Sequence, residues 1–199
     1  MNLPNRITMA RLFLIPVVVF FYLSSSFISC GKLIATIVFS IAVFTDFLDG
    51  YYARKLNLVT TLGKFLDSIA DKMLVLSAFV LLICDGTIFS PYGAIATIII
   101  LTREFIVSTV RQIGASKNVI IAADMWGKVK ANFQFFTVIF FMLFSYLIDL
   151  SVLSNTLNLI FMITCYSLLA ITVLATVISG IRYVVKNISV FSEKEVKNN

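Results

Sequence analysis

The feature that most constrains this chain is a series of long apolar runs separated by short polar connections. A helix needs about 20 predominantly apolar residues to cross a bilayer. Six runs are close to or above that length, at residues 11–28, 33–54, 64–84, 91–113, 129–149 and 155–183. Of the 199 residues 60% are apolar and 13% are charged, whereas a soluble domain carries about 25% charged residues. We therefore predict an all-α polytopic membrane protein with six transmembrane helices.

The sequence predicts one bundle, because no Pro/Gly/Ser-rich linker or clear internal repeat divides it. Residues 1–10 mix apolar and polar positions at helical spacing and are expected to form an N-terminal interfacial helix. A signal peptide is the alternative for this region, but everything downstream is itself apolar enough to be embedded. We expect a single six-helix domain over residues 11–185 and a polar tail over residues 186–199.

Basic residues occupy alternate connections of the predicted bundle. One side holds Arg6, Arg11, Arg54, Lys55, Lys64, Arg111, Lys117, Lys128, Lys130, Arg182, Lys186, Lys194 and Lys197. The other side holds only Lys32, Asp85 and Asp149 among charged residues. Because cytoplasmic loops carry the excess of Lys and Arg, we predict that both termini are cytoplasmic. The net charge of +6 then reflects loops near anionic lipid rather than nucleic-acid binding.

The composition also excludes several kinds of chemistry. The chain has no histidine, which rules out Ser-His-Asp and Cys-His catalysis and any His-rich metal site. Its three cysteines are scattered without a C-x-x-C pair, so neither a zinc knuckle nor a redox motif is present.

Four of the ten acidic residues fall inside two predicted spans, as Asp46-x-x-Asp49 and Asp67-x-x-x-Asp71. These spacings put each pair on one helix face. At about 1.5 Å per residue, both pairs lie ~6–12 Å below the cytoplasmic surface. On antiparallel neighbours, the four carboxylates would converge at one depth. Carboxylates in hydrocarbon are costly and normally mark function.

Four such acids repel one another, so a positive charge is expected among them. Basic side chains are poor candidates, because Arg54 and Lys64 lie at the rim and Lys72 points about 100° away from Asp71. An all-oxygen site suits Mg²⁺ or Mn²⁺, and four Asp residues could hold two ions. Helix packing through protonated Asp side chains is the structural alternative.

The acids belong to a longer pattern, Asp46-x-x-Asp49-Gly50-x-x-Ala53-Arg54, eight residues, then Gly63-x-x-x-Asp67-x-x-x-Asp71. This pattern is similar to the signature of the CDP-alcohol phosphotransferase (phosphatidyltransferase) family, and all eight positions match. The resemblance implies an enzyme that replaces the CMP of a CDP-alcohol by a second alcohol, using divalent metals in a cytoplasm-facing cavity. It implies metal ligation by Asp46, Asp49, Asp67 and Asp71, with Asp71 also the general base. It also implies a cytidine diphosphate site formed by Gly50, Ala53, Arg54, Gly63, Asn5 and Thr8.

Three further segments resemble the branch of this family that makes phosphatidylglycerophosphate from CDP-diacylglycerol and sn-glycerol 3-phosphate. They are Leu3-Pro-Asn-x-Ile-Thr-x-x-Arg11, Arg103-Glu104-Phe105 and Gly127-Lys128-x-Lys130. Two positions depart from that branch, since Ser68 replaces a usual proline and Ala131 a usual threonine.

Positive charge at the cytoplasmic mouth independently favours a phosphorylated acceptor. Arg103, Arg111, Lys128 and Lys130 are the candidate contacts to its phosphate. Each has a structural alternative: Arg111 could instead pair with Glu104, seven residues away, and Arg103 could pair with a neighbour or snorkel.

Other functions remain open from the sequence. An inositol phosphate or a phosphatidylglycerol (as in cardiolipin synthesis) could be the acceptor, and a cation transporter is a remote alternative. A transporter would spread its acids across the whole depth of the bilayer, whereas the four signature acids are predicted in its cytoplasmic half. The resemblance further implies a homodimer in a bacterial inner membrane, with membrane lipid as the surroundings and no nucleic-acid partner.

Overall fold

The computed structural model of this chain is built from helices. It describes residues 3–55, 61–116 and 125–187, although the side chains of residues 3–7, 46–55, 61, 62, 64, 65, 115, 116, 126 and 128 are not described. The α-helices are α1 (Leu3–Leu23), α2 (Gly31–Lys55), α3 (Thr61–Cys84), α4 (Ser90–Ser116), α5 (Met125–Asp149) and α6 (Asn155–Lys186). A short 3₁₀ helix, η1 (Ser24–Ser26), follows α1. The described residues contain no strand.

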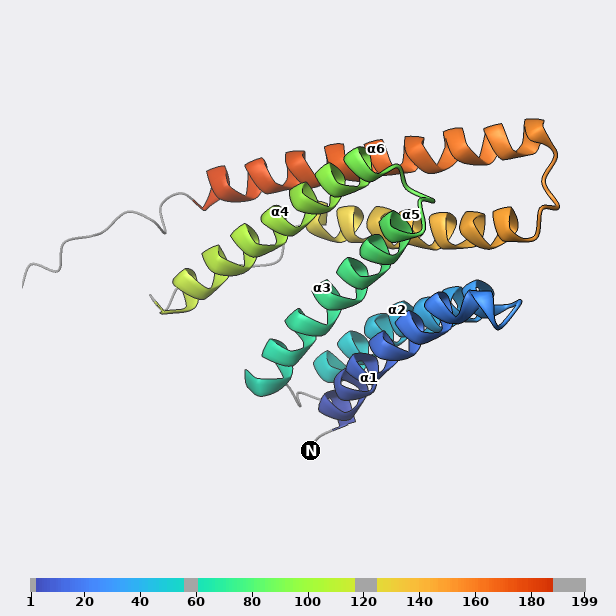
Figure 1. The fold of residues 1–199 in the computed structure, drawn as a ribbon. Coiled ribbons are helices and arrows are strands. Elements are labelled where there is room, and N and C mark those ends of the chain that lie inside the picture. Colours follow the sequence, from blue (N-terminus) through green and yellow to red (C-terminus); the bar gives the residue numbers. More distant parts are fainter. Residues whose placement is uncertain (1–2, 56–60, 117–124, 188–199) are drawn as a thin grey trace, which may run out of the picture.

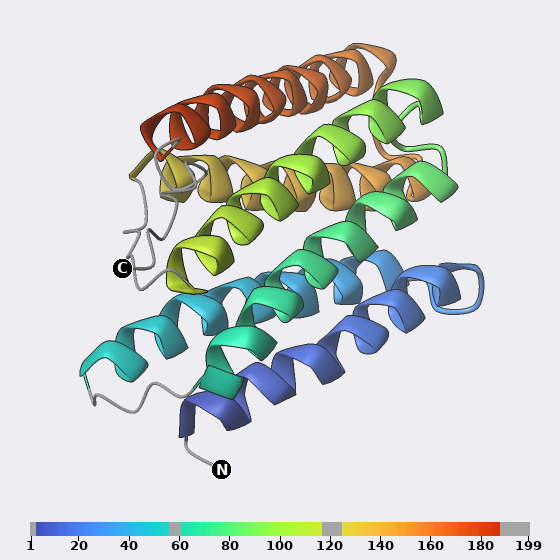
Figure 2. The same ribbon diagram turned by 90° about the vertical axis from the view of Figure 1, so that its left-hand side faces the viewer.

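Helices α3 and α5 contact each other, and each connects the α1–α2 hairpin to the remaining helices. Helix α1 packs along α2 and also against α3, while α2 packs against α5. On the other side, α4 lies between α3 and α6, and α5 packs along α6. Figures 1 and 2 show this arrangement, with the α1–α2 hairpin below and the α5–α6 pair above. Helix α1 begins and α6 ends at the same end of the bundle (Figure 2).

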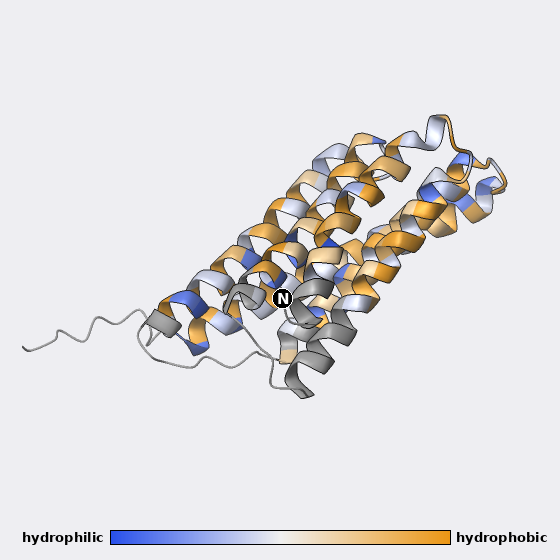
Figure 3. Cartoon of the chain, turned by 90° about the horizontal axis from the view of Figure 1, so that it is seen from below, coloured by the Kyte–Doolittle hydropathy of each residue, from blue (hydrophilic) through white to orange (hydrophobic). Residues whose placement is uncertain are grey.

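The core is apolar and uses small residues where helices approach closely. Ala35 and Ala42 on α2 and Ala70 and Ala78 on α3 are completely buried. Small side chains let helix backbones approach, which supplies the van der Waals contact that holds membrane helices together. Figure 3 shows that hydrophobic residues occur along the whole length of the helices. Many large apolar side chains are exposed, among them Phe13, Phe44, Ile98 and Leu174.

Among the residues that the structure describes, four helices are long and apolar enough to cross a membrane: Thr8–Ser26, Ser90–Gly114, Val129–Asp149 and Asn155–Lys186. In α2, the apolar stretch Gly31–Thr45 is shorter. Helix α3 carries Asp67, Asp71 and Lys72 in its first half, and these charges lower its apolar character. The predicted all-α fold is confirmed over the described residues, and each predicted run overlaps a helix. The described part of the predicted interfacial segment belongs to the same helix, α1, as the first apolar run.

Lys32, Asp85 and Asp149, the charged residues predicted on the outer side, form one cluster. Lys32 Nζ lies 3.2 Å from Asp85 Oδ2 and 2.9 Å from Asp149 Oδ2. Tyr22 Oη and Ser145 Oγ also donate hydrogen bonds to Asp85 Oδ2. The cluster therefore ties together α1, α2, α5 and the loop between α3 and α4, where Lys32 is only 8% exposed.

The hydrogen bonds to Asp85 outweigh the effect of its burial. Burial raises the pKa of this carboxyl, but hydrogen bonds from Tyr22, Ser145 and the Thr87 backbone hold the pKa below its ordinary value. The ionised form is the one that these donors stabilise.

The turn from η1 into α2 depends on a glycine. A Cβ on Gly31 would lie 2.5 Å from the Phe21 carbonyl oxygen and 3.0 Å from Ser25 Cα. Both of these are backbone atoms, so a side chain could enter only if the hairpin opened.

We predict that Gly31→Ala lowers the free energy of unfolding by about 1–3 kcal/mol, the usual cost of overpacking. Thermal unfolding in detergent measures the change, with Ser26→Ala at an exposed position as the control. A variant as stable as the parent would show that the hairpin has room for the methyl group.

We predict that Asp85→Asn destabilises the protein at neutral pH by about 1–3 kcal/mol, and that the difference disappears in acid. The pKa of Asp85 is lower in the folded state than its ordinary value of 3.8. Its stabilisation is therefore present above pH 3.8 and is lost as the pH falls through the folded-state pKa. Unfolding of parent and variant at several pH values tests this, and a pH-independent difference would contradict it.

Candidate active site

The four signature acids lie on two helices at the end of the bundle opposite the Lys32 cluster. Asp46 and Asp49 belong to the last part of α2, and Asp67 and Asp71 to the first half of α3. Because the backbone is helical at all four positions, each pair shares a helix face. The side chains of Asp46 and Asp49 lie outside the described residues, and so does the predicted meeting of the two pairs.

The residues predicted to bind cytidine diphosphate come from three helices. Thr8 is buried on α1, three residues before Arg11, and Gly63 is half-buried in the first turn of α3. The other four positions have helical backbones, but their side chains lie outside the described residues: Asn5, Gly50, Ala53 and Arg54.

Asp67 is held by an arginine from another helix. Arg11 Nη1 on α1 donates a hydrogen bond to Asp67 Oδ1 at 3.0 Å. The Arg11 side chain is 1% exposed and the Asp67 side chain 50%. A buried guanidinium needs a counter-charge, while the exposed half of the carboxylate can still accept another ligand.

The prediction that basic side chains are poor candidates for the positive charge among the acids is therefore wrong for Asp67. It considered basic residues on or beside the acidic helices, whereas Arg11 lies 56 residues before Asp67 in the sequence. Lys72 Nζ donates a hydrogen bond to Ser68 Oγ at 2.6 Å, on its own helix. Only the packing of α1 on α3 brings Arg11 to the acids.

A second ion-paired cluster lies between α4 and α5. The Glu104 carboxylate of α4 accepts a hydrogen bond from Lys130 Nζ of α5, and Arg103 Nη1 lies 3.4 Å from the same oxygen. The Lys130 side chain is 1% exposed and that of Arg103 10%. Two of the four cations predicted to bind an acceptor phosphate are thus adjacent in the structure.

Arg103 also reaches α6. Its Nη2 donates to Ser179 Oγ at 2.6 Å. A Cβ on Gly180 would lie 2.9 Å from Arg103 Cγ, and a Cβ on Gly127 of α5 would lie 3.4 Å from Nη2. The Arg103 side chain therefore lies next to Gly180 of α6 and Gly127 of α5, where the absence of a side chain leaves it room. The structural alternative, that Arg103 pairs with a neighbour, is realised by Glu104.

Arg111 follows two turns later on α4 and is exposed. Its Nε donates to Tyr183 Oη at 3.1 Å, and its guanidinium carbon lies 5.6 Å from the centre of that ring. The alternative pairing of Arg111 with Glu104 is not found, since Glu104 binds Lys130 and Arg103 instead. Lys128 lies on α5 with its side chain outside the described residues.

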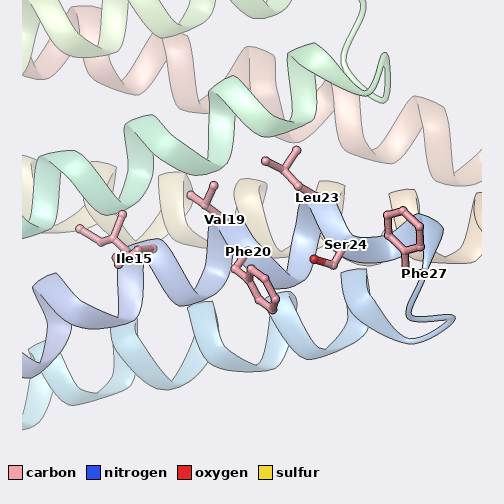
Figure 4. Close-up of a pocket in the computed structure, with 7 residues that line it drawn as sticks. Ile15, Val19, Phe20, Leu23, Ser24 and Phe27 are labelled. Carbon is pink, nitrogen blue, oxygen red and sulfur yellow. The ribbon is translucent and has the colours of Figure 1, made fainter.

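A large apolar groove on α1 is unrelated to these charged groups. It has a volume of about 590 Å³ and is lined by Ile15, Pro16, Val19, Phe20, Leu23, Ser24 and Phe27. Figure 4 shows its side chains along α1 and the following turn. A lining of this kind suits lipid hydrocarbon rather than a phosphate.

Comparison with known proteins decides the family. Residues 1–178 match the sequence profile described as CDP-alcohol phosphatidyltransferase. This chain belongs to that family. It is similar to proteins named CDP-diacylglycerol–glycerol-3-phosphate 3-phosphatidyltransferase from three bacteria. The protein of Bacillus subtilis (strain 168) is 42% identical over 147 residues, which cover 69% of this chain and 74% of the relative.

Two other relatives carry the same name. The protein of Rickettsia bellii (strain RML369-C) is 40% identical over 138 residues, covering 69% of this chain and 72% of the relative. That of Haemophilus influenzae is 40% identical over 136 residues, covering 67% and 71%. Membership in the family agrees with the resemblance drawn from the acidic signature.

The donor set of the signature fits the divalent metals on which the family generally depends. Its four aspartates offer only carboxylate oxygens, which hard cations such as Mg²⁺ and Mn²⁺ prefer. Asp67 is half exposed although Arg11 binds one of its oxygens. Among the side chains that the structure describes, no three His, Cys, Asp or Glu residues are grouped as a metal site; Asp46 and Asp49 lie outside that set.

We predict that Arg11→Met lowers the free energy of unfolding by about 1–3 kcal/mol, because Asp67 loses a charge-assisted hydrogen bond. In a double-mutant cycle with Asp67→Asn, the two changes should couple by about 0.5–3 kcal/mol. Unfolding in detergent measures all four proteins. Strictly additive effects would show that the pair contributes no interaction of its own.

Proposed function

We propose that this chain transfers the phosphatidyl group from CDP-diacylglycerol to sn-glycerol 3-phosphate, with phosphatidylglycerophosphate and CMP as products. The observation that carries the proposal is the 42% identity to a relative named for this activity. The buried cations on α4 and α5 add a physical reason, because they suit an acceptor that carries a phosphate.

We place this reaction in a bacterial inner membrane, with six spans, an interfacial segment at residues 1–10, both termini in the cytoplasm and a polar tail at 186–199. The excess of basic residues at the end that holds the acids supports this orientation. Residues 11–185 then form a single catalytic domain whose site opens to the cytoplasm. We further propose a homodimer surrounded by membrane lipid.

The acids would hold the metals of the site. Asp46, Asp49, Asp67 and Asp71 are the proposed ligands of two ions, Mg²⁺ or Mn²⁺. When bound, such ions neutralise a pyrophosphate and polarise the phosphorus under attack. Arg11 keeps the Asp67 carboxylate in place for this role, since it binds Oδ1 at 3.0 Å.

Asp71 is the proposed general base, and it takes the proton of the attacking hydroxyl. The acceptor oxygen bonds to the phosphorus that carries diacylglycerol, while the bond from that phosphorus to CMP breaks. A direct displacement fits a chain without histidine, because a phosphohistidine intermediate is impossible. In this proposal Gly50, Ala53 and Gly63 leave room for the donor's cytidine diphosphate, and Asn5, Thr8 and Arg54 bind it.

The acceptor phosphate would be bound by Arg103, Arg111, Lys128 and Lys130. Arg103 and Lys130 are already held by ion pairs with Glu104, and Arg111 is held by a hydrogen bond to Tyr183. Pre-positioned cations favour an anion without a further loss of side-chain entropy. A neutral alcohol would gain nothing from them.

We predict that Asp71→Asn reduces turnover by at least about 10²-fold while the protein stays folded, because the amide cannot accept the proton. The measurement is CMP release from CDP-diacylglycerol in detergent, with Mn²⁺ or Mg²⁺ and sn-glycerol 3-phosphate. Asp149→Asn, at the opposite end of the bundle, is the matched control and should keep most of the activity.

The same assay separates the possible acceptors. Metal-dependent release that requires sn-glycerol 3-phosphate supports the proposal. Release that instead requires inositol phosphate or phosphatidylglycerol would keep the family and replace the acceptor. Full activity of Asp71→Asn would remove the proposed base.

A further inference from the structure

Glu104 is a carboxylate in a place where the proposed reaction needs only positive charge. It lies on α4, and its side chain is 21% exposed. It binds Lys130 of α5 and faces Arg103 of its own helix. Neither the acidic signature nor the proposed acceptor site includes it, so its presence among the cations needs an explanation.

The charges of this cluster do not balance. Glu104, Lys130 and Arg103 together carry a net charge of +1, and the nearby Lys72 and Asp71 have opposite charges that cancel each other. Excess charge in an apolar bundle is unfavourable unless a counter-charge arrives. Glu104 therefore neutralises enough charge for the cations to remain buried, while the remaining positive charge attracts an anion.

Arg103 has hydrogen-bonding capacity to spare. Its Nε is buried and has no hydrogen-bond partner within the described part of the chain. Its side chain is nine-tenths buried, so an unsatisfied N–H here is costly. A phosphate oxygen is an acceptor suited to a guanidinium N–H.

Helix α6 sets the path of the same arginine. Ser179 accepts from Arg103 Nη2 at 2.6 Å, and the neighbouring Gly180 leaves the arginine room, since a Cβ would lie 2.9 Å from its Cγ. The position of the Arg103 guanidinium is thus determined by the Glu104 carboxylate of α4 and by the Ser179 hydroxyl and Gly180 of α6.

We propose that Glu104 is a positioning residue for the acceptor-phosphate site: its carboxylate holds Lys130 and Arg103 in place. Ser179 and Gly180 of α6 hold Arg103 from the other side of its path. The inference rests on the proposed function and deepens it. Glu104 acts through the two cations and does not itself contact the substrate.

The test compares Glu104→Gln, Glu104→Asp and Gly180→Ala with the parent. Glu104→Gln should raise the KM for sn-glycerol 3-phosphate by about 10–100-fold, the effect typical of losing a side chain that orients a metal ligand. The KM for CDP-diacylglycerol should change less than about twofold, because only acceptor binding is affected. Glu104→Asp keeps the charge and should recover part of the loss. Gly180→Ala should raise the same KM, because the methyl group displaces Arg103.

Gly93→Ala is the matched control for the glycine variant. A Cβ on Gly93 would meet Ile83 Cγ1 at 2.7 Å and Ile88 Cγ2 at 2.8 Å, so this change crowds apolar side chains and no cation. It should lower thermal stability without altering the KM for the acceptor. An equal shift of that KM in Gly93→Ala would assign the effect of Gly180→Ala to general loosening.

A binding measurement separates this inference from the proposed function. Inorganic phosphate should raise the unfolding temperature of the parent protein, and Glu104→Gln should abolish that rise. If the parent binds phosphate but does not use sn-glycerol 3-phosphate, the proposed function fails and the positioning role stands. If folded Glu104→Gln keeps both its phosphate response and its KM, or loses kcat and both KM values together, the positioning role is wrong.

Discussion

The structure depends on one constraint, which is that a charge buried among apolar helices must meet an opposite charge from elsewhere in the fold. In the described part of the chain, three clusters satisfy it: Arg11 with Asp67, Lys32 with Asp85 and Asp149, and Lys130 with Glu104. Each cluster joins side chains from different helices. These ion pairs add contacts between specific residues to the close packing of small side chains that holds membrane helices together.

The three clusters lie at different ends of the molecule, and only one end carries the proposed site. The Lys32 cluster closes the end where α1–α2, α3–α4 and α5–α6 are connected, and it carries no part of the proposed chemistry. The other two clusters lie at the opposite end. Arg11 binds one of the signature acids of α2 and α3, and Glu104 binds the cations of α4 and α5. Since α3 and α5 are in contact, the signature acids of α3 and Lys130 of α5 lie on adjoining helices.

Most of the fold and the family could be predicted from the sequence. Apolar runs mark the helices because hydrocarbon requires each backbone to satisfy its own hydrogen bonds, and fixed spacing marks the acids because a helix repeats every 3.6 residues. Arg11 could not be assigned this way, since its partner is 56 residues away. For Glu104 the spacing indicated Arg111, but Lys130 on α5 lies closer in space.

The sequence by itself therefore determined the membrane class, the helices, the acidic signature and the set of candidate cations, because all of these follow from local composition and periodicity. Only the tertiary structure decided which charges meet: Arg11 with Asp67, Arg111 with Tyr183, and Arg103 between Gly180 and Gly127. The physical reason is that ion pairs depend on distance in space, which the packing of whole helices fixes and which the spacing of residues along one helix does not contain.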